Sequence, residues 1–128
     1  PINSKADLIG ECSKKIHAGE TLIIFPEGTR TNKEIGYKLA RGAAYVALAA
    51  QKPVEVVTID TSTAFLTKEI KWYNVPKERT VFRVRPACSW DVNIHLAKTK
   101  SMAVRTLTQD WTRYFQEGRL NASSSINK

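Results

Sequence analysis

An acid, a hydroxyl and a guanidinium occur together in one short stretch of the chain, at Glu27, Thr29 and Arg30. A hydroxyl and a guanidinium can hydrogen-bond to an anionic substrate, and arginine matches the geometry of phosphate. Gly28 lies among them and permits backbone angles, or a close approach, that other residues resist. Pro26 precedes them and cannot donate a hydrogen bond to a β-ladder, so strand pairing should stop there. The sequence therefore predicts a polar turn suited to binding.

The segment before this turn is predicted to be a strand. Residues 22–25 are apolar and rich in β-branched side chains, and they are too few for a helix. Such a run is typical of a strand buried on both faces of a sheet. In open α/β sheets, ligands bind just outside the carboxyl ends of the strands. The turn at 26–30 is therefore expected where a binding site would lie.

The turn resembles the signature block of a known enzyme family. Residues 25–30, Phe-Pro-Glu-Gly-Thr-Arg, are similar to the signature of the glycerolipid acyltransferases, the 1-acyl-glycerol-3-phosphate acyltransferase family. A weaker likeness follows at 52–57, where the family has a proline-centred start of a strand. There Val56 replaces the family's usual second proline, and Glu55 stands where an apolar residue is expected. The likeness covers roughly residues 4–60.

The resemblance implies an enzyme of phospholipid synthesis. It would transfer a fatty acyl group from acyl-CoA or acyl-carrier protein to the hydroxyl of a lysophospholipid such as 1-acyl-glycerol-3-phosphate. It implies no metal and no cofactor beyond the acyl thioester donor. The expected location is the cytoplasmic side of a membrane, held peripherally or by sequence not present here, with the anionic membrane surface as a partner.

Carried onto this chain, the resemblance gives the signature turn the task of binding the acceptor. Arg30 would hold the phosphate, Gly28 would let it approach the backbone, and Thr29 would add a hydroxyl. Glu27 would hold the glycerol hydroxyl or orient Arg30, with Phe25 and Pro26 in supporting positions. The competing interpretation is a plain surface turn in which Glu27 and Arg30 pair with each other.

The family's catalytic base is a histidine in a His-x-x-x-x-Asp arrangement, and this chain does not contain it. Five residues after His17 comes Leu22, and five after His95 comes Lys100. We therefore expect no catalytic residue in these 128 residues and no activity of the chain alone. The expectation is that the natural protein extends N-terminally and that the base lies there.

The expected fold is α/β, a largely parallel or mixed central sheet flanked by helices, like the glycerol-3-phosphate acyltransferases and incomplete at its N-terminus. Residues 1–120 are interpreted as the C-terminal portion of an acyltransferase domain and 121–128 as a flexible tail. Strand, helix and strand over about 40 residues predict a right-handed βαβ unit. The expected helices are 5–17, with Ser4 as N-cap and Gly19 at its end, 38–51, and 101–117, ended by Gly118. The expected strands are 22–25, 54–59 and 80–85, the last closed by Pro86, with a short strand or hairpin arm at 69–73. Residues 89–98 are expected to be irregular.

A net charge of +8 is the strongest feature of the composition. It favours acidic partners, which include nucleic acid, anionic lipid head groups and phosphorylated substrates. A non-catalytic phosphate- or lipid-binding domain and a nucleic-acid-binding module are the alternative functions. The second is disfavoured because the chain lacks a basic helix, an aromatic pair or a recognised binding motif.

The remaining polar and aromatic residues are expected to have structural roles. Cys12 and Cys88 lack metal-ligand spacing and are expected to be buried, reduced thiols. His17 should complement the dipole at the end of the first helix, and His95 should be exposed. Trp72, Trp90 and Trp111 are expected in the core or rim, with a membrane interface left open for one of them. Arg83 and Arg85 are expected to face solvent or to guide an acidic carrier or head group. Asp60 and Asp91 have no partner at an informative spacing in the sequence.

Overall fold

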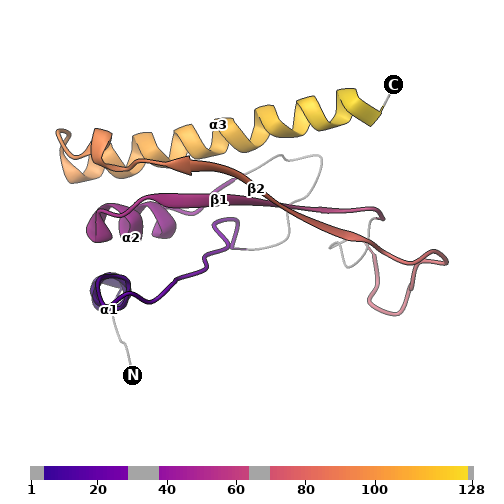
Figure 1. The fold of residues 1–128 in the computed structure, drawn as a ribbon, viewed down its shortest axis with the longest axis horizontal. Coiled ribbons are helices and arrows are strands. Elements are labelled where there is room, and N and C mark those ends of the chain that lie inside the picture. The colour runs from indigo at the N-terminus through magenta and orange to yellow at the C-terminus, as the bar shows by residue number, and fades with distance from the viewer. Residues whose placement is uncertain (1–4, 29–37, 64–69, 127–128) are drawn as a thin grey trace.

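The structure is a computed structural model that describes residues 5–28, 38–63 and 70–126, with side chains described for 7–28, 38–63 and 70–118. Within these ranges the chain forms helices, a β-hairpin and one short 3-10 helix (Figure 1). In chain order the elements are α1 (Lys5–His17), α2 (Gly42–Ala50), β1 (Val54–Thr61), β2 (Phe82–Trp90), η1 (Asn93–His95) and α3 (Lys100–Ile126).

The sheet of the described residues is an antiparallel pair, β1 with β2. Its register shifts after Val56, which pairs with Cys88, because Val57 pairs with Pro86 and leaves Ala87 as an extra residue on β2. A bulge of this kind tolerates a proline, which has no N–H to donate to the ladder. The prediction that Pro86 closes the strand is therefore wrong, since β2 continues to Trp90.

The core lies where α2 and α3 meet the end of the hairpin that contains Val54 and Trp90. Figure 1 shows α3 along one side of the hairpin and α1 on the other side. Val92 and Leu107 are fully buried there. The expectation that the second helix is largely buried is confirmed, over the shorter span of α2. The core cluster consists of Leu39, Ala44, Ala47, Leu48, Val92, Ala103, Val104, Leu107 and Trp111.

Helix α1 has the predicted bounds and the predicted C-terminal cap. Gly19 adopts a left-handed backbone with φ of 94°. Its N–H donates to the Ile16 carbonyl at 3.1 Å, and the Glu20 N–H donates to the Lys15 carbonyl at 3.0 Å. This pair of bonds is the Schellman arrangement, which satisfies carbonyls at the helix end and favours glycine at the left-handed position.

The predicted strand at 22–25 is wrong. These residues form no strand, and the side chains of Ile23 and Phe25 are 77% and 72% exposed. A strand needs a neighbour for its backbone N–H and C=O groups, and no strand of the described residues pairs with this segment. The βαβ unit is consequently not formed, and the described sheet is antiparallel rather than largely parallel. The fold of the described residues is still α/β, but its sheet has only the two strands β1 and β2.

The C-terminal half also departs from the predictions. Residues 70–73 form no strand, and residue 69 lies outside the described residues, as does Ser4. The segment expected to be irregular contains the end of β2 and the η1 turn. Helix α3 continues through Gly118 to Ile126, because one glycine inside a helix costs only about 1 kcal/mol and does not by itself end it.

Candidate functional site

The first half of the signature turn is well defined. The Gly28 N–H donates to the Phe25 carbonyl at 3.2 Å, which closes a four-residue turn. Gly28 has φ of 65°, in the left-handed region that favours glycine. The predicted need for glycine at this position is therefore met by the local backbone.

A second backbone bond joins this turn to the start of the next helix. The Ala40 N–H donates to the Pro26 carbonyl at 2.7 Å. Ala40 lies just before α2, so the chain returns to the turn after residues 27–39. Thr29 and Arg30 belong to this returning loop and lie outside the described residues, so the roles predicted for them stay predictions.

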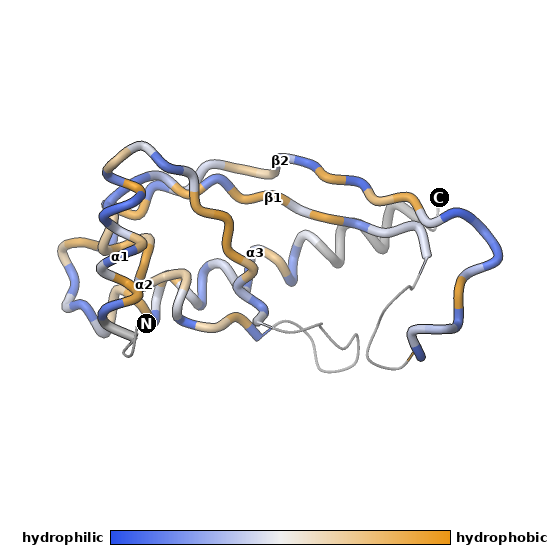
Figure 2. Tube along the Cα trace, turned by 90° about the horizontal axis from the view of Figure 1, so that it is seen from below, coloured by the Kyte–Doolittle hydropathy of each residue, from blue (hydrophilic) through white to orange (hydrophobic). Residues whose placement is uncertain are grey.

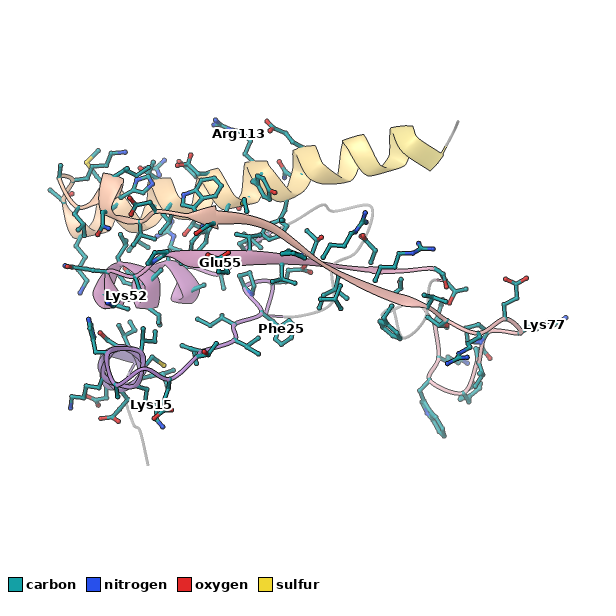
Figure 3. The ribbon with its side chains drawn as sticks, in the orientation of Figure 1. Lys15, Phe25, Lys52, Glu55, Lys77 and Arg113 are labelled. Atoms are coloured by element: carbon teal, nitrogen blue, oxygen red, sulfur yellow. The ribbon has the colours of Figure 1, made fainter. Side chains whose placement is uncertain are left out.

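Glu27 and Phe25 have contrasting surroundings. Glu27 is partly buried, and this desolvation raises the pKa of its carboxyl above the ordinary value of 4.5. A partly desolvated carboxyl is a stronger hydrogen-bond partner for a hydroxyl than a fully hydrated one. Phe25, by contrast, lies on the side of the hairpin away from α3 and is largely exposed (Figure 3). The structure describes Phe25, Pro26, Glu27 and Gly28 as one compact turn.

His95 is buried, so the expectation of an exposed histidine is wrong. The residue is 4% exposed, and its Nε2 lies 3.7 Å from Oδ2 of Asp110 on α3. Neither ring nitrogen has a hydrogen-bond partner among the described residues. The fifteen-residue separation of His95 and Asp110 carries no sequence signal, because the fold of η1 onto α3 alone brings them together.

A histidine beside an aspartate is the pairing that supports general-base catalysis. Here the His95 side chain is only 5% exposed, whereas a base must reach the proton of its substrate. The η1–α3 packing closes over the ring. We therefore assign the His95–Asp110 pair to the packing of this end of the molecule and not to proton abstraction.

Two aspartates for which sequence spacing indicated no partner have one in the structure. A carboxylate oxygen of Asp60 pairs with the Arg85 guanidinium across the hairpin, where both side chains are exposed. Asp91 Oδ1 accepts a hydrogen bond from the Asn93 N–H at 2.9 Å, which satisfies a donor at the start of η1. Neither contact forms a site.

The cysteines and His17 largely follow the predictions. Cys12 and Cys88 are free thiols, although both are half-buried rather than fully buried. A side-chain hydrogen bond with Cys88, aided by desolvation, raises the pKa of Tyr114. His17 Nδ1 lies 2.8 Å from the Ser13 carbonyl oxygen in the last turn of α1, as expected of a histidine at a helix end.

The three tryptophans differ in exposure. Trp111 is buried in the core and Trp90 packs against it, as expected. Trp72, in contrast, is 79% exposed.

Among the described residues, no cluster of histidine, cysteine or acidic side chains could hold a metal ion. Over the same residues, no helix combines the length and apolarity needed to cross a bilayer.

Comparison with known proteins gives one match. Residues 2–62 match the family model described as Acyltransferase, which is slightly under half of the chain. No curated protein and no solved structure matches. The matched segment contains α1, the whole signature turn, α2 and β1, and it supports acyl transfer as the general activity.

Proposed function

We propose that this chain is the acceptor-binding part of an enzyme that transfers a fatty acyl group from acyl-CoA or acyl-carrier protein to the hydroxyl of a lysophospholipid such as 1-acyl-glycerol-3-phosphate. The observation that carries the proposal is the Phe-Pro-Glu-Gly-Thr-Arg turn at 25–30, which lies inside the matched segment. The coarser conclusion, acyl transfer, rests on the match; the substrates are our proposal.

The turn has the properties that a phosphate site needs. Arg30 supplies a planar guanidinium that can bind two phosphate oxygens, and Thr29 supplies a hydroxyl donor. Gly28 has no Cβ, and the space that a Cβ would occupy is open among the described residues, so an anion can approach the main chain there. The Ala40–Pro26 hydrogen bond joins the signature turn to the segment just before α2.

Acyl transfer also requires a base that takes the proton of the acceptor hydroxyl, and stabilisation of the tetrahedral oxyanion. The family's histidine–aspartate spacing is not found in this sequence, and His95 is closed off by packing. In the proposal, the base therefore comes from outside these 128 residues, and the role of this chain is to position the acceptor.

The net charge of +8 supports a place at a membrane whose surface is anionic. A lysophospholipid acceptor resides in such a surface, so binding there raises its local concentration at the turn. We place the protein at the cytoplasmic side of that membrane.

Acceptor binding tests the proposal directly. Titration of the chain with a short-chain, water-soluble lysophosphatidate should show saturable binding, and Arg30→Ala should weaken it roughly tenfold to hundredfold because one charge-assisted contact is lost. Arg113→Ala is the matched control, because Arg113 points away from the core on α3 (Figure 3). An unchanged affinity in Arg30→Ala, or an equal loss in the control, would contradict the assignment.

The same charge also favours a nucleic-acid-binding module. Titration against duplex DNA over a salt series separates the two functions, because phosphate-backbone binding weakens steeply with salt. Tighter binding to DNA than to lysophosphatidate, with a steep salt slope, would favour the module.

A further inference from the structure

The end of the hairpin exposes large apolar side chains that the packed part of the molecule would bury. We call residues 70–83 the hairpin tip. Trp72 is 79% exposed, Tyr73 56%, Val75 73% and Phe82 60%. Tryptophan is among the most buried residues on average, and a cluster of exposed apolar side chains marks an interaction surface. We therefore expect the hairpin tip to bind a partner that has an apolar component.

Basic side chains surround these apolar groups. Lys71, Lys77, Arg79 and Arg83 all lie in the tip and are exposed, and Glu78 is the single acidic residue among 70–83. The Lys71 ammonium stands 5.7 Å from the centre of the Tyr73 ring, close enough for a cation–π contact. The partner must therefore be anionic as well as apolar.

The apolar surface continues along one face of the hairpin. Val57 pairs with Pro86 and Ile59 with Val84, so these side chains share a face. Val57, Ile59 and Val84 are all exposed on it. The opposite face carries Trp90, whose ring packs edge-on against Tyr114 of α3. The exposed face is therefore the one that α3 does not cover.

The tip stands apart from the packed body. In Figure 1 the hairpin extends away from α1 and α2, with the tip at its far end. Figure 2 shows hydrophilic and hydrophobic residues alternating along this end of the chain. A flat anionic surface can therefore reach the tip without meeting the helices at the other end.

We propose that the hairpin tip is a docking surface for an anionic lipid bilayer. Tryptophan and tyrosine concentrate at membrane interfaces because the ring prefers the apolar side and its polar atom prefers water. Basic side chains beside them add electrostatic attraction to an anionic surface. Trp72 and Tyr73 insert at the head-group level, and Lys77 and Arg79 pair with lipid phosphates.

This docking surface uses residues other than the signature turn, so it does not depend on acyl transfer. Lipid docking and acceptor binding can therefore be broken separately.

Vesicle co-sedimentation of the full chain tests the docking surface. Vesicles of phosphatidylcholine mixed with phosphatidylserine should bind it, and pure phosphatidylcholine vesicles should bind it at least about tenfold less because the head-group attraction is lost. The double variant Lys77→Gln, Arg79→Gln should lose roughly tenfold to thirtyfold in affinity for the anionic vesicles. Its control, Arg105→Gln with Arg113→Gln, removes the same charge from exposed positions of α3 and should bind like the parent.

The aromatic contribution has its own control. The double variant Trp72→Ala, Tyr73→Ala should lose at least about tenfold in vesicle affinity, because two interfacial rings are removed. Ile94→Ala with Met102→Ala removes exposed apolar side chains at the opposite end of the molecule and should have no effect. Circular dichroism of each variant checks that the fold is retained.

Fluorescence identifies the residue that enters the bilayer. Lipids brominated near the head group should quench the parent, and Trp72→Phe should abolish that quenching while Trp90 and Trp111, packed in the body, continue to emit. The Lys77→Gln, Arg79→Gln variant should bind the short-chain lysophosphatidate like the parent, so failure of the signature turn and failure of the tip are distinguishable.

Three results would overturn the proposal. Wild-type quenching in Trp72→Phe would place another residue in the bilayer. Equal losses in the tip and control charge variants would show attraction by net charge alone. Tighter binding to single-stranded DNA than to vesicles, or a dimer that Trp72→Ala dissociates, would assign the tip to nucleic acid or to a second copy of the chain.

Discussion

The two faces of the β-hairpin both carry apolar residues, in opposite environments. On the face toward α3, Val56 is 7% exposed. On the other face, Ile59 and Val84 pair across the strands and are 52% and 63% exposed. The difference shows that apolar alternation along a strand identifies a face suited to burial but does not say whether anything covers it.

The covering helices account for the contrast. The apolar stripe of α3 contains Ala103, Val104, Leu107 and Trp111, all buried in the core cluster. Among the described side chains, Phe115 is the last of α3 that packs on this cluster. Burial of apolar area stabilises the fold by about 25 cal/mol per Å², so the covered face contributes most of the stability and the uncovered face is open to a partner.

The largest expected effect comes from creating a cavity at the packed end. Leu107→Ala should lower the free energy of unfolding by about 2–5 kcal/mol, because Leu107 is fully buried and its neighbours cannot collapse onto the gap. Val84→Ala, on the exposed face, should change it by less than about 0.5 kcal/mol. Urea denaturation measures both. Similar losses of stability in the two variants would show that something also covers the exposed face at Val84.

A smaller effect is expected from the buried histidine. His95→Leu should change the free energy of unfolding by no more than about 1 kcal/mol, and in the stabilising direction if the leucine fits, because it removes buried polar atoms that have no hydrogen-bond partner among the described residues. Asp110 remains solvated, since its side chain is 32% exposed. Urea denaturation again provides the measurement. A loss as large as that of Leu107→Ala would mean that the ring makes contacts that hold η1 on α3.

The smallest effect concerns the pH dependence of the signature turn, whose Phe25 lies on the side of the hairpin away from α3 (Figure 3). Burial raises the pKa of Glu27, so the folded state binds its proton more tightly than the unfolded state. This contribution to stability is present below the ordinary pKa of 4.5 and is lost as the pH rises through the raised pKa.

Glu27→Gln removes this titration. The stability of the parent minus that of the variant should therefore fall as the pH rises from below 4.5 through the raised pKa. Thermal melts at a series of pH values measure the difference. A stability difference that rises over this window would mean that folding favours the ionised carboxylate of Glu27, and so lowers its pKa.

Features that depend on a few neighbouring residues were predictable from the sequence. The bounds of α1 and its Gly19 cap were correct, because amphipathic spacing and the need for a left-handed residue are local. The strand after Pro53 and the turn at Gly28 were correct for the same reason. The resemblance to acyltransferases at residues 25–30 was likewise identified from the sequence, and the residues that match the family model include it.

Features that depend on distant neighbours were decided by the tertiary structure alone. The apolar run 22–25 had the composition of a buried strand, but no strand of the described chain lies beside it to accept its hydrogen bonds. His95 gave no sign of burial, because Asp110 and α3 reach it only after η1 folds back. The local sequence thus determined the bounds of α1, the turn at Gly28 and the resemblance to acyltransferases, while long-range packing decided which apolar faces are covered and which remain open, since covering requires a partner that no local pattern specifies.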